Sequence, residues 1–136
     1  MSFIEINGLG DVQEDSVQPE GEYNLIVVDR YTYQKEGASN YIIRIKHAFE
    51  GIDNAMPATI WLSLPGPDDT PDVMKFKLRT LARYLHASGI PFESNGFNDE
   101  DIEIGTTFSC RVTLSEPDDN GNSYNNLLLP RLPHEG

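Results

Sequence analysis

The chain has 136 residues, of which 22 are acidic and 10 basic, so its formal net charge is -12 at pH 7. Its length and its hydrophobic content of 38% suit one globular domain, and no apolar run approaches the roughly 20 residues that a membrane helix needs. The single cysteine, Cys110, excludes an intrachain disulfide and a multi-cysteine zinc site, and the acidic balance disfavours strong binding to duplex DNA or to an anionic membrane.

Residues 1–20 are predicted to form an acidic N-terminal arm. Its stretch Phe3-Ile4-Glu5-Ile6 predicts a short strand, and the acids that follow show little periodicity. The N-terminus lacks the basic and apolar segments of a secretory signal, so we expect a cytoplasmic protein. Pro19 and Gly21 mark the start of a folded domain predicted over residues 21–131, followed by a short tail over residues 132–136.

Three strands are predicted next, from Glu22 to Tyr33, from about Asn40 to Phe49 and from Ala58 to Leu64. Alternation in the second strand directs its even positions outward. The third strand alternates in the same way and directs Trp61 outward. The residues expected to face the core are Tyr41, Ile43, Ile45, His47, Phe49, Ile60, Leu62 and Leu64.

A helix is predicted after these strands. Thr70 is its expected N-cap, Pro71 occupies the first helical position, and Gly89 ends it. Lys75, Arg79 and Arg83 are spaced by four and share one face, which we interpret as a solvated face. The expected buried stripe consists of Met74, Leu78, Leu81 and Leu85.

Two further strands complete the domain, from about Thr106 to Ser115 and from Ser123 to Pro130. The first should direct Arg111 outward and Phe108, Cys110, Val112 and Leu114 inward. Asn120-Gly121 between the strands predicts a type I′ hairpin turn. Three strands, one helix and two strands predict a mainly β fold, a five-stranded OB-fold-like barrel with the helix between strands 3 and 4.

Several short motifs add a resemblance to a known family. The segment Pro19-Glu20-Gly21-Glu22-Tyr23 resembles the entry motif of phage-encoded, OB-fold, single-stranded-DNA-binding-like proteins, a family long catalogued as a domain of unknown function. Ser39-Asn40-Tyr41, Leu62-Ser63-Leu64, Lys77-Leu78-Arg79-Thr80-Leu81 and Ala87-Ser88-Gly89-Ile90-Pro91 resemble its later blocks, as does the Asp99-Glu100-Asp101-Ile102 lead into the fourth strand. The resemblance implies a phage origin, and hence the host cell cytoplasm as location, and single-stranded nucleic acid binding. The residues Leu132-Pro133-His134-Glu135-Gly136 do not resemble the acidic tail that such proteins often use to recruit replication partners.

Outward cations and rings define the candidate nucleic-acid-binding site, because a single strand needs cations along its backbone and flat rings under its bases. Tyr31 and Tyr33 belong there if the first strand bulges, and Arg30 and Thr32 take their place if it does not. For Trp61, packing against a loop or the arm is an equal alternative. We expect 3–5 phosphate contacts and a log–log salt slope of about -2 to -3.5. The candidate residues are Arg44, Lys46, Trp61 and Arg111, with Arg30, Tyr31 and Tyr33 at the edge.

Catalysis is not expected. The three histidines are isolated, no phosphate-binding loop is present, and Asp118–Asn122 suits a hairpin better than a calcium loop. Neither a cofactor nor a metal is therefore predicted.

Two main hypotheses remain open at this level, and an enzyme accessory domain ranks third after them. The first is a sequence-tolerant single-stranded DNA binder of phage replication or recombination, with RNA and a homo-oligomer left open and the acidic arm competing for the groove. The second is a protein-interaction or assembly module without a nucleic acid role, in which residues 3–6 pair with another subunit's sheet edge.

Overall fold

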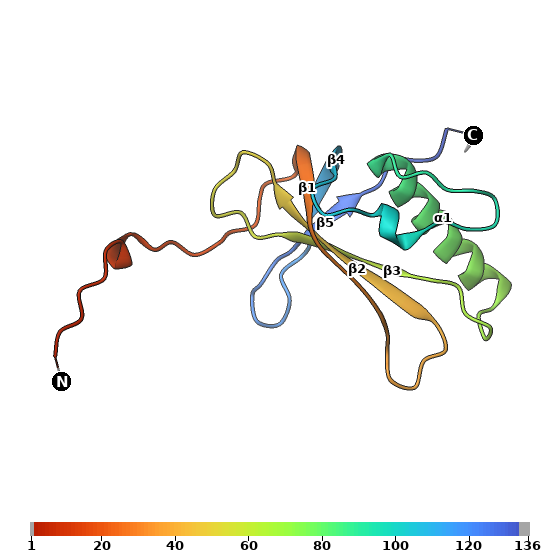
Figure 1. Ribbon diagram of the computed structural model, residues 1–136, viewed down its shortest axis with the longest axis horizontal. Helices are drawn as coiled ribbons and strands as arrows, with labels where there is room; N and C mark the ends of the chain where they lie inside the picture. The colour runs from red at the N-terminus through yellow and green to blue at the C-terminus, as the bar shows by residue number, and fades with distance from the viewer. Residues whose placement is uncertain (1, 134–136) are drawn as a thin grey trace.

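The computed structural model describes residues 2–133 of the chain. Its strands are β1 (Gly21–Gln34), β2 (Tyr41–Phe49), β3 (Ala58–Ser63), β4 (Thr107–Leu114) and β5 (Asn125–Leu128), its long helix is α1 (Pro71–Ser88), and two short 3-10 helices are η1 (Leu9–Asp11) and η2 (Asp99–Asp101) (Figure 1). The antiparallel sheet has the order β3-β2-β1-β4-β5, and β5 returns beside β3. The predicted OB-fold-like barrel, nearly closed and with its helix between β3 and β4, is confirmed. His134 and the end of the predicted tail lie outside the described residues.

A bulge in β1 decides which of its side chains point outward. The strand pairs with β4 through residues 21–26 and with β2 through residues 25–34. Val27 lies opposite His47 and Asp29 lies opposite Lys46, so Val28 is an extra residue in β1. Because one inserted residue reverses the alternation, the even positions beyond Val28 share the inward side with Ile43 and Ile45 of β2.

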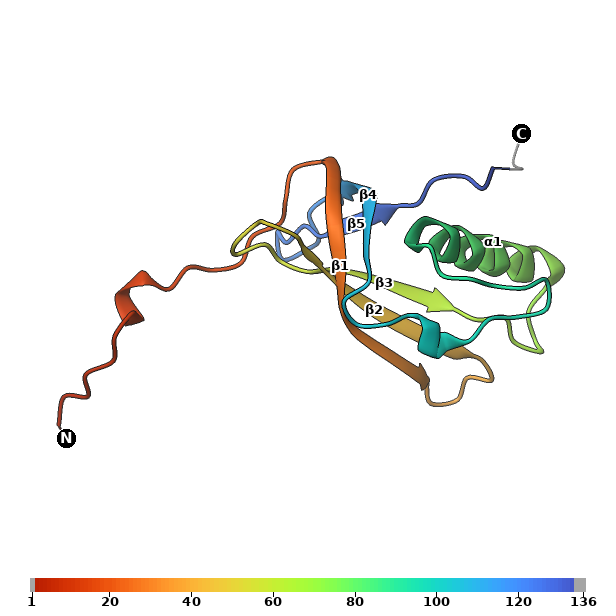
Figure 2. The same ribbon diagram turned by 45° about the horizontal axis from the view of Figure 1, so that its top comes forward.

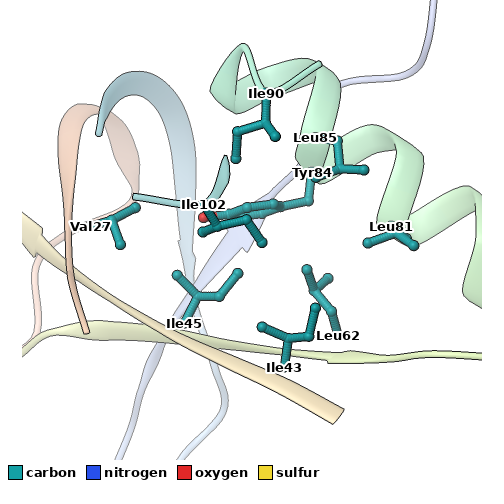
Figure 3. Packing of buried hydrophobic residues seen from close by; sticks show 9 residues of the cluster. All are labelled: Val27, Ile43, Ile45, Leu62, Leu81, Tyr84, Leu85, Ile90 and Ile102. Atoms are coloured by element: carbon teal, nitrogen blue, oxygen red, sulfur yellow. The ribbon is translucent and has the colours of Figure 1, made fainter. Parts of the chain in front are cut away.

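The main core lies between the barrel and α1 (Figure 3). Leu81, Tyr84 and Leu85 of the helix are buried against side chains from β1, β2 and β3, with Ile90 and Ile102 closing the cluster. The predicted helical stripe is therefore correct at Leu81 and Leu85 and wrong at Met74 and Leu78, which are exposed. The first turns of α1 extend past the strands (Figures 1 and 2), which agrees with the exposure of these two side chains.

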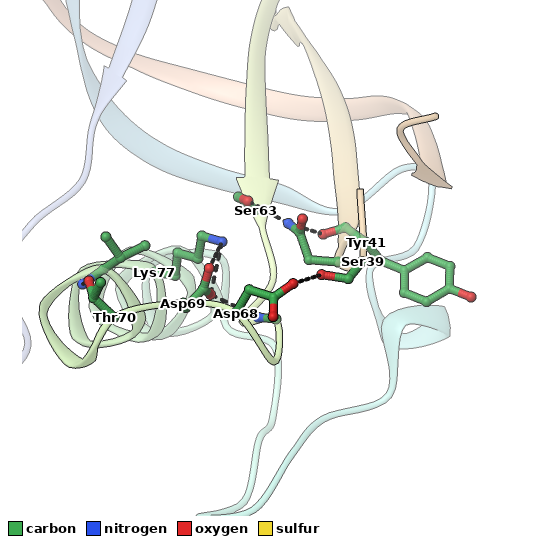
Figure 4. A network of polar contacts seen from close by, with 10 residues as sticks. Ser39, Tyr41, Ser63, Asp68, Asp69, Thr70 and Lys77 are labelled. Carbon is green, nitrogen blue, oxygen red and sulfur yellow. Dashed lines mark hydrogen bonds and ion pairs between the residues drawn. The ribbon is translucent and has the colours of Figure 1, made fainter. Parts of the chain in front are cut away.

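Polar contacts fix the start of α1 (Figure 4). The Thr70 hydroxyl accepts a hydrogen bond from the Val73 N–H at 3.3 Å, which confirms the predicted N-cap. The Asp69 carboxylate accepts from the Gly66 N–H at 2.8 Å and from Lys77 Nζ at 2.9 Å. Both contacts hold the pKa of Asp69 below its usual value. At the other end Gly89, with φ of 74°, ends the helix as predicted.

The hairpin between β4 and β5 forms as predicted, but the prediction of a type I′ turn is wrong. Gly121 has a φ of 78°, whereas a type I′ turn also needs a positive φ at Asn120, and Asn54 is the only such non-glycine residue in the described chain. The Asp118 carboxylate instead accepts from the N–H groups of Asn120 and Asn122 at 2.9 and 3.0 Å. This Asx arrangement stabilises the turn without a left-handed Asn120. Leu114, predicted to face the core, is exposed at the strand end.

The second half of the arm contacts the barrel, beginning at Gln13, whose Oε1 accepts from Asn54 Nδ2 at 3.1 Å. Ser16 forms a bridge with Ala55, and Gln18 exchanges hydrogen bonds of 2.8 and 2.9 Å with the Asn125 side chain. Residues 2–12 are exposed and lead away from the barrel (Figures 1 and 2). The strand predicted for residues 3–6 is absent from the described structure, because no neighbouring strand lies there to pair with it.

Candidate functional site

Three predicted site residues form one row across three adjacent strands. Tyr31 of β1 lies directly opposite Arg44 of β2, and Arg44 lies directly opposite Trp61 of β3. Trp61 is 58% exposed and Tyr31 is 57% exposed, so both rings are accessible from solvent. We call Tyr31, Arg44 and Trp61 the outer row. The alternative for Trp61, packing against a loop or the arm, is not excluded by this exposure, because Met56 and Pro57 of the loop before β3 line the same pocket as the ring.

Aromatic contacts order the β1 side of the outer row. Tyr31 and Tyr33 are two positions apart and so point to the same side of β1, which the bulge at Val28 makes the outer side. Their rings stack with centroids 5.6 Å apart and an interplanar angle of 18°. The Arg44 guanidinium carbon lies 5.7 Å from the centroid of the Tyr31 ring, within reach of a cation–π interaction. The sequence predicted Tyr31 and Tyr33 in the site only if the first strand contains a bulge, and β1 contains one.

A pocket continues the site from the outer row toward the β4–β5 hairpin. It has a volume of about 460 Å³ and places Lys46, Thr59 and Trp61 on one wall and Tyr124 and Asn126 on the other. Half-exposed Tyr124 therefore brings a second ring to the Trp61 side. Sequence reasoning left Tyr124 undecided, because only the return of β5 beside β3 brings it there.

One acid lies within this cationic surface. Asp29 Oδ2 accepts a hydrogen bond from Arg44 Nη2 at 3.1 Å, and both side chains are substantially exposed. Sequence reasoning did not single out Asp29, since an acid next to a predicted bulge gives no signal of its own. The ion pair lowers the charge that Arg44 presents to a ligand.

Two predicted site residues, Arg30 and Arg111, lie neither in the outer row nor beside it. Arg30 lies opposite inward-facing Ile45, and its Nη1 donates to Asp99 at 3.5 Å. The bulge thus places Arg30 on the inward side of the sheet and Tyr31 on the outward side. Arg111 points outward, but its β1 neighbour is Glu22, nine positions before Tyr31, which is roughly 30 Å of strand. A barrel has outward positions all round, so sharing that orientation does not bring two residues together.

The inward side beyond the bulge is acidic and accessible. Tyr41, predicted to be buried, is 52% exposed because β2 extends past the barrel there, and Figure 4 shows its ring directed away from α1. It lines a cavity of about 840 Å³ with Thr32 and three carboxylates, those of Glu93, Asp99 and Asp101. This surface repels a polyanion, in contrast to the outer row.

The titratable groups of the core are structural. His47 Nδ1 lies 2.9 Å from the Ala58 carbonyl, to which it must donate, so its Nε2 accepts from the Tyr84 hydroxyl at 2.8 Å. Burial lowers the pKa of His47 to about 4 and raises the pKa of the Cys110 thiol to about 11. A neutral histidine and a protonated thiol with no access to solvent do not suit catalysis.

Neither a metal centre nor a membrane span emerges from residues 2–133. No three His, Cys, Asp or Glu side chains in this range lie close enough to hold a metal ion. No helix in the same range is both long and apolar enough to cross a bilayer.

No protein-family model and no curated protein matches this chain. The fold itself defines an OB-fold-like barrel, a class compatible with oligonucleotide binding.

Proposed function

We propose that the protein is a nonenzymatic, sequence-tolerant binder of single-stranded nucleic acid. The observation that carries the proposal is the outer row, in which two accessible rings flank a guanidinium across β1, β2 and β3. OB barrels bind oligonucleotides on the face formed by strands 2 and 3 and the adjoining loops. Rings that stack on bases and cations that meet phosphates are the two elements such binding requires.

Each residue of the site has a role in this proposal. Trp61 and Tyr31 stack on bases, and Tyr33 stacks on Tyr31 and orients its ring. Arg44 contacts the phosphate backbone of the nucleic acid. Lys46 and Tyr124 extend the contact toward the β4–β5 hairpin. With two or three phosphate contacts rather than five, the log–log salt slope should be about -1.4 to -2.1.

The ligand and the setting follow from the resemblance noted in the sequence. The likeness to phage single-strand binders supports single-stranded DNA as the ligand, and replication or recombination of phage DNA as the process. The net charge of -12 supports the preference for single strands, because duplex binding without base stacking depends on neutralising many phosphates.

A titration tests the proposal. Fluorescently labelled oligo-dT, oligo-rU and a duplex of equal length are titrated with the protein at low and moderate salt, and binding is followed by anisotropy. We expect binding to oligo-dT that weakens with salt at the slope given above, and weaker binding to the duplex. Absence of binding to both oligo-dT and oligo-rU at low salt would refute the proposal. Tighter binding to oligo-rU would retain the site and replace DNA by RNA.

A further inference from the structure

The N-terminal arm is rich in apolar side chains that nothing in its own chain covers. Phe3 is 92% exposed, and four more large apolar residues of the arm are exposed with it, namely Ile4, Ile6, Leu9 and Val12. The chain is held to the barrel from Gln13, whose Oε1 accepts from Asn54 Nδ2 at 3.1 Å, and at Ser16, whose N–H donates to the Asn54 carbonyl at 2.8 Å. Such a density of exposed apolar residues marks an interaction segment rather than an ordinary surface.

A second unpartnered apolar surface lies on the other side of the molecule. A groove of about 500 Å³ runs between α1 and residues 92–97. Leu78 and Phe92 are half-exposed at its opening, where a bound segment would meet them first. Its apolar walls consist of Leu64, Leu78, Leu81, Ala82, Leu85, Phe92 and Phe97. We call this the α1 groove.

The charges of the two surfaces are complementary. The first 29 residues contain no base, and Glu5 lies between the apolar side chains of the arm. The helix beside the α1 groove carries four bases, and two of them, Lys75 and Arg79, lie three positions from Leu78 and Ala82 respectively. That spacing places them on the adjoining helix face, at the rim of the groove. One acid, Glu93, lies on the opposite wall.

The positions of the two surfaces favour contact between copies. Figures 1 and 2 show the arm leaving the barrel at the end opposite α1. The Ser16 bridge and the Gln18 hydrogen bonds hold the base of the arm at that end. The arm of one molecule is thus directed away from its own α1 groove and is accessible to a neighbour.

We propose that residues 3–6 of one copy dock into the α1 groove of a second copy, with Glu5 facing the bases at its rim. The contact joins two different surfaces, so repetition produces a ring or an open head-to-tail chain. It leaves the outer row uncovered and does not depend on nucleic acid binding.

Complementary variants test this contact in the full-length protein. The arm variant combines Phe3→Ser with Ile6→Ser, and the groove variant combines Leu78→Ser with Phe92→Ser; all four side chains are exposed, so folding should survive. Sedimentation equilibrium should show that the mass of the wild type rises with concentration, whereas each variant alone stays monomeric. An equimolar mixture should stop at a dimer, because one variant retains a groove and the other retains an arm.

A charge exchange and a control complete the experiment. Glu5→Lys and Lys75→Glu should each weaken association, and a mixture of the two should recover part of it, whereas Ile104→Ser, at another exposed apolar residue, should associate like the wild type. A wild type that is monomeric at every concentration, as expected if the arm folds onto its own groove, would overturn the proposal. So would a monomeric mixture, or variants that associate like the wild type.

Discussion

Polar residues on the two sides of β2 have different roles. On the inward side His47 is fully buried, and both of its ring nitrogens have partners in β3 and α1. On the outward side, Lys46 and Arg44, one and three positions before His47, remain accessible beside exposed rings. A buried polar group with satisfied hydrogen bonds stabilises the fold, and an accessible one is available to a ligand. The side of β2 on which a polar residue lies, rather than its type, thus decides whether it stabilises the fold or is available to a ligand.

Arg30 and Arg44 sharpen this contrast because each is paired with an aspartate. Arg30 meets Asp99 on the inward side, next to an acidic cavity. Arg44 meets Asp29 on the outward side, between two accessible rings. Similar ion pairs thus lie in opposite surroundings, and only the outward pair belongs to a surface suited to a polyanion.

The largest expected effect concerns the inward side and pH. Because the pKa of His47 is about 4 in the folded protein and about 6.5 when unfolded, the unfolded chain binds more protons between these values. The contribution of neutral His47 to the free energy of unfolding is therefore fully present above pH 6.5, and it falls by about 3 kcal/mol as the pH is lowered to 4. Urea unfolding at a series of pH values measures this decline.

Two histidine variants separate His47 from the other titrating groups. His47→Phe should lower stability at pH 7, since it leaves the Tyr84 hydroxyl unpaired, but it should flatten the decline between pH 6.5 and 4. His86→Gln, at an exposed histidine, should keep the wild-type decline. An unchanged pH profile in His47→Phe would show that other groups cause the acid sensitivity.

The strand alternation made much of this comparison predictable from sequence. A period of two predicted Arg44, Lys46 and Trp61 outward and Ile43 and His47 inward, because the pattern is local to each strand. It failed at Tyr41, since alternation cannot show where a strand extends past the barrel.

What the sequence missed depends on contacts between distant segments. The position of the bulge follows from the pairing of β1 with β2, and it decides the sides of Arg30 and Tyr31. The separation of Arg111 from the outer row follows from the curvature of the barrel, and the approach of Tyr124 to Trp61 from its closure. None of these is recorded in the spacing of residues along one strand.

The next largest effect concerns the rings. Trp61→Ala should weaken binding to oligo-dT by about 1–3 kcal/mol, or about 5- to 150-fold, because it removes a stacking surface. Tyr41→Ala is the matched control, since that ring is about as exposed but lies on the acidic side. Anisotropy titrations of both variants measure the difference. Equal losses in the two variants would remove the distinction between the two sides.

A smaller effect should distinguish the two arginines. Arg44→Ala should weaken binding to oligo-dT and make the log–log salt slope shallower by about 0.7, the contribution of one phosphate contact to a single strand. Arg30→Ala should leave both quantities unchanged, because Arg30 points toward Asp99. Titrations across a salt series give the slopes. If the Arg30 variant shows the shallower slope, the phosphate path lies on the inward side.

The smallest effect should come from the acid within the site, and its direction is the informative part. Asp29→Asn removes the charge that Arg44 now faces at 3.1 Å while keeping a side chain of similar shape. An exposed ion pair contributes up to about 1 kcal/mol, so affinity for oligo-dT should rise by no more than about 5-fold, with little change in stability. Asp53→Asn, at an exposed acid outside the site, controls for the change in net charge. A gain in both variants would reflect the overall field of an acidic protein, whereas a gain confined to Asp29→Asn would show that Asp29 restrains Arg44 until a phosphate replaces it.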